Sequence, residues 1–153
     1  TVKDIEEIYD VRILLESYAI KNSVKTLTSK NIQELMETLQ LLVKYYEKND
    51  LTHYIEVDTQ LHQYIINLGG NSLIVDTYRR IYSQSQQFRI YSLTTQRRFD
   101  DSVTEHRSIV ENICSGNWKE ADRVNKIHLA LAREEIIQHF ESKKAVEEEK
   151  ENE

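Results

Sequence analysis

The feature that most constrains the fold of this chain is the near absence of helix-breaking residues. It contains no proline, and its three glycines fall at only two places, Gly69-Gly70 and Gly116. Proline and glycine are the residues that most often interrupt helices, so the long stretches between these places can remain helical. Apolar residues recur at helical spacing in at least six segments, and no segment has the alternation of a strand. The sequence therefore predicts an all-α fold, an antiparallel bundle of six or seven helices.

Capping residues and glycines predict where these helices begin and end. Asp, Ser, Thr or Asn precedes several apolar stripes, where its side chain can accept a backbone N–H. Gly69-Gly70 and Gly116 follow apolar stripes, where glycine accepts the left-handed C-cap conformation. We expect one helix at about residues 4–25, a second from a cap at Thr28, a third at about 51–68 after a cap at Asp50, and a fourth from a cap at Asn71 to about residue 93. After a polar connection at 94–98, a fifth helix is expected at about 101–115 and a sixth from a cap at Asn117.

The length of 153 residues fits one domain with a substantial core. Residues 1–142 form the expected helical domain, and the charged tail at 143–153 is expected to fray. Cys114 is the only cysteine, which excludes an internal disulfide, and we expect it to be a small buried side chain rather than a nucleophile. These features predict a reduced, cytoplasmic protein.

Composition also bears on possible partners. The first residues lack the basic start and apolar stretch of a signal peptide, and no apolar run approaches the ~18 residues of a membrane span. The formal net charge of −6 and the pI near 5.4 argue against a large nucleic-acid surface, because such surfaces need clustered Lys and Arg. We expect no membrane contact, and contact with DNA only through another segment.

Four polar residues fall on apolar stripes. Asp58 and His62 occupy positions of the 51–68 helix that its pattern reserves for apolar side chains, and they lie one turn apart on one face. His106 interrupts the apolar series of the 101–115 helix in the same way, and His128 interrupts that of the last helix. Three separate helices are therefore expected to point a carboxylate and imidazoles inward.

A single inward histidine is most simply a core residue whose ring is satisfied by a backbone carbonyl. Four such residues need a common explanation, because each unsatisfied buried polar group costs ~1–3 kcal/mol of a typical stability of ~5–15 kcal/mol. A carboxylate with three neutral imidazoles is a good ligand set for a divalent transition metal such as zinc, nickel or manganese. The two other histidines, His53 and His139, do not share this placement, and we expect both to be solvated.

The sequence around these positions is more specific than their spacing. In chain order it contains Arg12-Ile13-Leu14-Leu15-Glu16, then Gly70-Asn71-Ser72-Leu73, then Glu105-His106-Arg107, then Gly116-Asn117 and Ala121 before His128. This ordered set, spread over about residues 4–140, resembles the C-terminal ligand-binding (FCD) domain of the FadR-like branch of the GntR family of bacterial transcription regulators.

The resemblance implies one divalent metal per chain, held by Asp58, His62, His106 and His128. It also implies a homodimer, and DNA contact through a winged-helix domain that would precede Thr1 and is not part of this sequence. The chain departs from the family pattern where Leu61 replaces an aromatic residue and Asn125 replaces an apolar one, and neither change removes a ligand.

A metal with four protein ligands keeps one or two positions for water or for the carboxylate of a small organic acid. Arg12, on the buried side of the first helix, and Arg89, on the fourth, could each hold that carboxylate, and Asn125 could add a hydrogen bond. The sequence thus favours a binding module in which a small acid shifts the packing of the helices and re-aims DNA-binding domains.

Two other interpretations stay open. A helical metalloenzyme, a hydrolase or an oxygenase, would use the metal to activate water or oxygen, and Glu105 would be its only obvious base. Alternatively, the chain is a dimerising bundle in which the four polar residues form a buried hydrogen-bond network. Tyr78, Tyr82 and Tyr91 are candidates for a dimer contact, although core packing explains them equally well.

Overall fold

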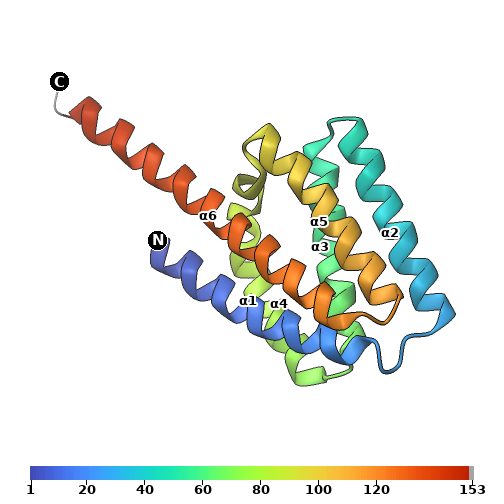
Figure 1. Ribbon diagram of the computed structural model, residues 1–153. Coiled ribbons are helices and arrows are strands. Elements are labelled where there is room, and N and C mark those ends of the chain that lie inside the picture. The colour runs from blue at the N-terminus through green and yellow to red at the C-terminus, as the bar shows by residue number, and fades with distance from the viewer. Residues whose placement is uncertain (152–153) are drawn as a thin grey trace.

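The computed structural model describes residues 1–151, and every extended element in that range is helical (Figure 1). The predicted all-α class is confirmed. The elements in chain order are α1 (Val2–Ser23), α2 (Ser29–Glu47), α3 (Leu51–Leu68), α4 (Ser72–Ser85), the 3-10 helix η1 (Gln86–Leu93), α5 (Gln96–Cys114) and α6 (Trp118–Glu151).

Side-chain caps begin six of the helices. In each case a hydroxyl, carboxylate or amide oxygen accepts the backbone N–H three residues further on, which satisfies one of the free donors of the first turn. The capping residues are Thr1, Thr28, Asp50, Asn71, Thr95 and Asn117. The caps at Thr28, Asp50, Asn71 and Asn117 are those that the sequence predicts.

The helices pack around a central α3. Helix α6 lies along α1 and against α5, and it also contacts η1, while α3 packs against α1 and α2, and α2 packs against α5. The chain directions in Figure 1 make α1 and α6 antiparallel, so that the N-terminus of α1 lies beside the later turns of α6. This arrangement brings α3, α5 and α6 together in the middle of the molecule.

Two apolar clusters stabilise this packing. The larger cluster joins α1, α2, α3 and α5 and includes Leu35, Leu61 and Ile109, each fully buried. The smaller one lies between α1 and α6 around Ile5 and Ile136. Burial of a large aliphatic side chain contributes about 1.5–3 kcal/mol, so these clusters supply the main driving force for folding.

The pair Gly69-Gly70 ends α3 and lets it approach α1. A Cβ atom on Gly69 would lie 2.8 Å from the Cα of Ala19, so only glycine permits this contact between the two helices. Gly70 has φ +72°, a left-handed conformation that costs other residues about 1–2 kcal/mol. The left-handed glycine predicted after α3 is therefore Gly70, while Gly69 itself remains right-handed.

Two helix boundaries differ from the sequence prediction. The α-helix expected to reach residue 93 ends at Ser85 and continues as η1, whose three residues per turn bring Arg89 and Ser92 to one buried face. Helix α5 begins at Gln96 rather than near 101, because Arg98 in the predicted connection is buried in an ion pair with Glu105.

The charged tail is also more regular than predicted. Helix α6 continues to Glu151 and projects beyond the body of the molecule (Figure 1), and the residue pair Lys144 and Glu148 lies one turn apart with an ion-pair distance of 3.7 Å. Such pairs stabilise exposed helices by a few tenths of a kcal/mol. The last two residues of the predicted tail, 152 and 153, lie outside the described part of the chain.

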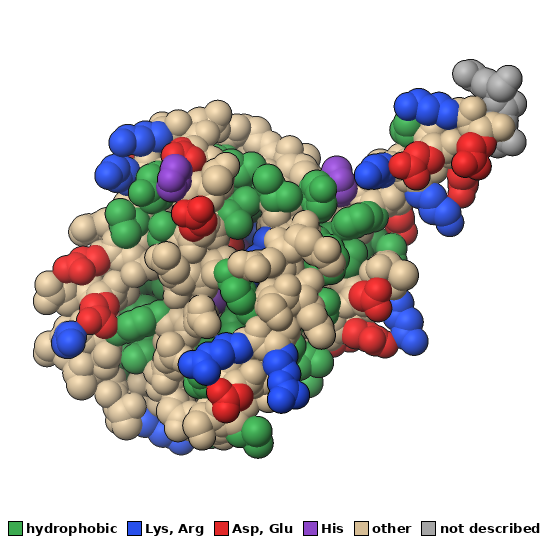
Figure 2. Space-filling view, turned by 180° about the vertical axis from the view of Figure 1, so that it is seen from behind, with side chains coloured by type: hydrophobic (Ala, Val, Ile, Leu, Met, Phe, Trp, Pro, Cys, Tyr) green, Lys and Arg blue, Asp and Glu red, His purple; other side chains and the backbone are tan. Residues whose placement is uncertain are grey.

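No helix between residues 1 and 151 combines the length and the apolar character that crossing a membrane requires. On the face shown in Figure 2, Lys and Arg side chains are interspersed with Asp and Glu rather than gathered into one basic surface. This distribution agrees with the charge argument made from the sequence.

Candidate metal centre

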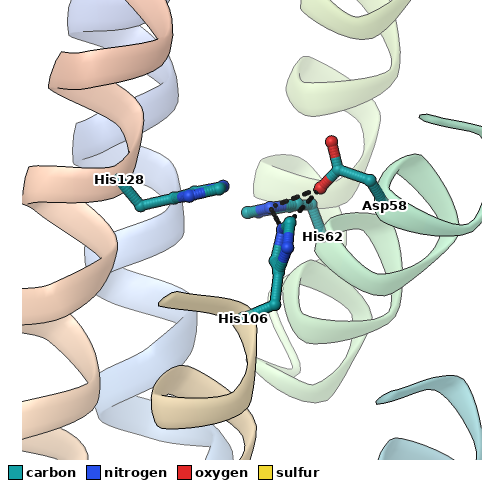
Figure 3. Close-up of side chains that lie close together, drawn as sticks. All are labelled: Asp58, His62, His106 and His128. Atoms are coloured by element: carbon teal, nitrogen blue, oxygen red, sulfur yellow. Dashed lines mark hydrogen bonds and ion pairs between the residues drawn. The ribbon is translucent and has the colours of Figure 1, made fainter. Parts of the chain in front are cut away.

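The four candidate ligands meet in the interior of the bundle. Asp58 and His62 come from α3, His106 from α5 and His128 from α6, and one potential ligand atom of each lies within 4.8 Å of all the others (Figure 3). The three imidazoles are buried, and the Asp58 side chain is 17% exposed. Residues separated by 70 positions in sequence thus form one polar cluster.

A carboxylate oxygen of Asp58 contacts two of the three imidazoles. Its Oδ1 atom is 2.8 Å from His106 Nε2 and 3.0 Å from His62 Nε2, and the two Nε2 atoms are 3.3 Å apart. The ring of His128 stacks on that of His62, with centroids 5.3 Å apart and an interplanar angle of 7°. Three donor atoms therefore already converge on one point, and His128 points toward it from the opposite side (Figure 3).

The Nδ1 atom of each imidazole contacts a polar group outside the cluster, which leaves Nε2 for the centre. Such outer contacts fix the orientation and the tautomer of a metal-binding histidine. The pairs are His62 with Glu16 Oε1 at 3.0 Å, His106 with the Tyr54 hydroxyl at 2.9 Å, and His128 with Glu105 Oε1 at 2.7 Å.

Glu16, from α1, joins this centre to its surroundings. Besides His62, its carboxylate accepts hydrogen bonds from Arg12 Nη2 at 3.1 Å, the Tyr78 hydroxyl at 2.7 Å and Asn125 Nδ2 at 3.0 Å. Burial alone would raise the pKa of Glu16, but the positive charge of Arg12 and the contact with His62 outweigh it, so this pKa lies well below its usual value. Glu16 is therefore a buried carboxylate ion.

Glu105 plays the corresponding part on the other side of the centre. Arg98 donates to both of its oxygens, at 2.9 and 2.5 Å. Burial opposes ionisation, but the hydrogen bonds from His128 and Arg98 lower the pKa of Glu105 to about 2. As the sequence indicates, Glu105 does not share the inward direction of His106, and it faces the outer nitrogen of His128 instead.

The charge states within the cluster suit metal binding. Burial, reinforced by the nearby His106, lowers the pKa of His128 to about 4, so its ring is neutral at pH 7, the form that binds metals. Burial would also lower the pKa of His62, but the carboxylates of Glu16 and Asp58 outweigh burial and raise it. Electrostatic interactions and hydrogen bonds with His106 and His62 hold the pKa of Asp58 well below its usual value, despite its burial.

The donor set fits a divalent transition metal. One carboxylate oxygen and three imidazole nitrogens match the ligands that zinc, nickel and manganese accept, and each imidazole already has an outer partner. Asp58, His62, His106 and His128 are the residues that would hold the ion. The same contacts also satisfy the side chains directly, as the interpretation of a buried hydrogen-bond network without metal expects.

The predicted effector residues are all buried close to this centre. Arg12 and Asn125 both contact Glu16, and Arg89 donates to the hydroxyl of Thr59, the neighbour of Asp58 on α3. Each keeps buried polar atoms without a hydrogen-bond partner within the described residues: Arg12 Nε, Arg89 Nε and Nη2, and Asn125 Oδ1.

The remaining histidines lie outside the cluster. His53 is exposed, as expected, and contacts Asp50 at 2.7 Å near the start of α3. His139 differs from the prediction, because it is half-buried and stacks on Tyr91 with ring centroids 4.0 Å apart. Cys114 is half-buried, and burial raises the pKa of its thiol, which agrees with a packing role.

Comparisons with known proteins identify the family of the chain. Residues 7–131 match the model of the FCD domain family. The chain is 25% identical over 141 residues to the HTH-type transcriptional regulator YdhC of Bacillus subtilis (strain 168), covering 92% of this chain and 58% of that protein. It is also 25% identical over 115 residues to the gluconate operon transcriptional repressor of that bacterium, covering 73% and 45%. The chain spans about half the length of these curated relatives.

Solved structures show the same fold. The metal-free FCD domain of TM0439 superposes with a TM-score of 0.79 at 24% identity, covering 93% of this chain and 97% of that one. The Zn²⁺-bound FCD domain of TM0439 gives a TM-score of 0.72 at 25% identity, covering 92% and 96%. Together with the family match, these findings confirm the resemblance seen in the sequence. The chain belongs to the FCD domain family, and the curated relatives that it matches are transcription regulators.

Proposed function

We propose that this chain is the metal-containing, effector-sensing and dimerisation domain of a bacterial transcription regulator. Its effector is a small organic acid, and binding of that acid changes the DNA affinity of a winged-helix domain outside this chain. The observation that carries the proposal is the convergence of Asp58, His62, His106 and His128 within 4.8 Å, from three helices, in the interior of the bundle.

Metal binding is supported by the chemistry of the donors and by a similar structure. A Zn²⁺-bound form is known for the FCD domain of TM0439, which shares the fold and 25% of its residues with this chain. A bound divalent ion would supply positive charge and an open position for an anionic ligand. The chain's own contribution is to hold the imidazoles through Glu16, Tyr54 and Glu105.

Sensing of an acid is supported by the unpartnered donors beside the centre. Arg12 is 4% exposed and Arg89 is 5% exposed, yet both keep guanidinium nitrogens without an acceptor. A buried donor without a partner costs about 1–3 kcal/mol, and a carboxylate ligand would remove that cost. A small organic acid therefore matches both cations.

Transmission of the signal is supported by the position of the centre. Its side chains and their immediate partners come from α1, α3, α5 and α6, so a ligand there contacts most of the bundle. A ligand that binds one arrangement of these helices better by ~1–3 kcal/mol changes operator affinity by roughly 5- to 150-fold. The effector must therefore distinguish two packings of the bundle.

The metalloenzyme interpretation gains no support from the site. Glu105, its only obvious base, has its carboxylate engaged by Arg98 and by the outer nitrogen of His128. A general base must reach the proton that it abstracts, and both oxygens of this carboxylate are already engaged by Arg98 and His128. The similarity to transcription regulators favours the same conclusion.

Dimerisation through α1 is supported by exposed apolar side chains. Val11, Leu14 and Tyr18 recur along one face of α1 and are 37%, 70% and 42% exposed. Of the tyrosine candidates, Tyr78 is a core residue at 1% exposure, whereas Tyr82 and Tyr91 are half-buried and Tyr91 stacks on His139. We expect a dimeric mass in solution and a shift toward the monomer for Leu14→Glu, measured by light scattering.

Metal analysis tests the centre. The chain is stripped with a chelator and titrated with zinc, nickel or manganese, and metal content and unfolding temperature are measured. We expect one ion per chain and a rise in unfolding temperature, both lost in His106→Ala and both kept in His53→Ala, the exposed control. A chain that neither retains metal nor gains stability would instead be a dimerising bundle with a buried polar network.

Effector binding is tested separately. The metal-loaded chain is titrated with organic acids by calorimetry, and operator affinity of the full-length regulator is measured with and without each acid that binds. We expect at least one acid to do both. The sensor proposal fails if no acid binds, or if no acid that binds changes the affinity of the regulator for its operator.

A further inference from the structure

The charges around the centre are unevenly paired. Two of the carboxylates have an arginine of their own: Glu16 pairs with Arg12 at 3.1 Å, and Glu105 pairs with Arg98 at 2.5 Å. The third, Asp58, contacts only histidines. A divalent ion bound by Asp58 and three neutral imidazoles would therefore keep one positive charge uncompensated.

Arg89 carries a second uncompensated positive charge. Arg89 is 5% exposed. Its guanidinium donates a hydrogen bond to the Thr59 hydroxyl and lies over the face of the Tyr82 ring, whose centroid is 5.1 Å from the guanidinium carbon. Its Nε and Nη2 atoms have no hydrogen-bond partner, and no carboxylate within residues 1–151 lies within ion-pair distance. A buried charge without a counterion is costly, which points to an anionic ligand.

Arg89 lies beside a surface groove and is connected to the metal centre through its neighbours. Its partner Thr59 follows Asp58 on α3, and both Thr59 and Arg89 line this groove of about 570 Å³ together with Tyr82, Gln86 and Gln87. Arg89 is also close enough to Tyr78 to influence the phenol electrostatically, and Tyr78 donates a hydrogen bond to Glu16, the partner of His62. Two short routes, through Thr59 and through Tyr78, thus connect Arg89 to the centre.

We infer that the effector is a dicarboxylate, with one carboxylate at the metal centre and the other held by Arg89. This rests on the proposed function, and it narrows the ligand from any small acid to one with two separated negative charges. The planar guanidinium has two free donor atoms, which suits two parallel hydrogen bonds to one carboxylate. A monocarboxylate would leave one of the two charges unpaired.

The first test compares acids matched in carbon number. The metal-loaded chain is titrated by calorimetry with succinate against butyrate, glutarate against pentanoate, and with inorganic phosphate, whose charges share one centre. We expect the best dicarboxylate to bind roughly 10- to 100-fold more tightly than its monocarboxylate counterpart, the gain expected for a charge-assisted hydrogen-bonded contact. Equal affinities, or tighter binding of phosphate, would overturn the inference.

The second test removes the guanidinium. Arg89→Met keeps a long apolar side chain, and Arg79→Met, at an exposed position of the preceding helix α4, is the matched control. We expect Arg89→Met to abolish most of the dicarboxylate advantage and Arg79→Met to preserve it. A dicarboxylate advantage that survives in Arg89→Met would contradict the assignment of Arg89.

Further measurements distinguish three outcomes: misfolding of a variant, failure of the dicarboxylate inference, and failure of the sensor proposal. Metal content and unfolding temperature are measured for each variant, and we expect ligand-free Arg89→Met to be at least as stable as the parent chain, because a buried unpaired charge is removed. If Arg89→Met loses metal or unfolds, Arg89→Gln replaces it in the titrations. Binding of monocarboxylates and dicarboxylates alike leaves the sensor proposal standing and refutes only the dicarboxylate inference, whereas binding of no acid refutes both.

Discussion

Glu105 Oε1 lies 2.7 Å from Nδ1 of His128, and this contact joins α5 to α6 beside the candidate metal centre. It turns the outer nitrogen of the imidazole to a carboxylate, so that Nε2 is the nitrogen available to an ion. Arg98 holds the same carboxylate from the other side at 2.9 and 2.5 Å. The orientation of His128 therefore depends on a residue that is not itself a candidate ligand.

Replacing Glu105 by Gln should weaken metal binding. The amide keeps the size of the side chain but removes the charge that orients His128 and raises its basicity, and loss of such a partner typically costs 10- to 100-fold in affinity. Affinity is measured by competition with a chelator. Glu111→Gln, at an exposed position of the same helix, is the control and should leave the affinity unchanged. Equal affinities for the two variants would contradict an orienting role.

Replacing Glu16 by Gln should destabilise the fold. The change leaves the buried guanidinium of Arg12, which is 3.1 Å from Glu16 Oε1, without its counterion. Breaking one partner of a buried ion pair costs about 3–5 kcal/mol. Urea denaturation measures this loss. Arg133→Gln, which removes a more exposed ion pair with Asp10 at 2.9 Å, should change stability little, and a similar loss in both variants would be evidence against the special cost of burial.

The metal-free chain should have a stability maximum near pH 6.5. The folded pKa of His128 is lowered to about 4, so between about 4 and 6.5 the unfolded state binds more protons and stability falls on acidification. The pKa of His62 in the folded state is raised above 6.5. Its contribution to stability is therefore complete below pH 6.5 and is lost as the pH rises through the folded-state pKa. Each limb has a slope of up to about 1.4 kcal/mol per pH unit.

Chelator-treated protein, denatured with urea at a series of pH values, tests this prediction. In His128→Gln the acid limb between pH 4 and 6.5 should become shallower while the alkaline limb remains. Glu105, whose pKa is lowered to about 2, contributes a further loss only as the pH falls from about 4.5 toward 2. An acid limb that is unchanged in His128→Gln would assign the effect to other groups.

Replacing Gly69 by Ala should separate α3 from α1. The new methyl group would lie 2.8 Å from the Cα of Ala19, a backbone atom that cannot move without its helix. We expect a loss of about 1–3 kcal/mol, as for other overpacked contacts, and weaker metal binding, because His62 on α3 depends on Glu16 on α1. In Gly70→Ala, with φ +72° and no neighbour within 4 Å, only the strain cost should appear, with metal affinity retained.

Much of the local structure follows from sequence because its causes are local. The caps at Thr28, Asp50 and Asn71 act on N–H groups three residues away, and the spacing of Asp58 and His62 on α3 places them on one face regardless of the rest of the fold. The sequence pattern alone therefore predicts the helical class, the starts of five helices to within a few residues, and the inward direction of the four candidate ligands.

Sequence periodicity does not predict the residues that contact the Nδ1 atoms of the three histidines. Arg98 was expected in a polar connection, and its burial depends on Glu105, seven residues away, and on the neighbouring α6. Tyr54 looked like an ordinary core aromatic, and only the packing of α3 against α5 brings its hydroxyl to His106. The role of Glu16 has a local cause. It lies one turn after Arg12 on the buried face of α1, and a buried carboxylate and a buried guanidinium at this spacing can pair.

The sequence by itself determined the helices, the family and which polar side chains must face the interior, because helix formation and amphipathic patterning depend on residues a few positions apart. Tertiary structure alone decided that Asp58, His62, His106 and His128 converge, and that Glu16, Tyr54 and Glu105 orient the imidazoles. It also decided that two guanidinium nitrogens of Arg89, Nε and Nη2, have no hydrogen-bond partner. Distances between helices far apart in the chain arise from packing, and pairing of buried charges is settled only when those helices meet.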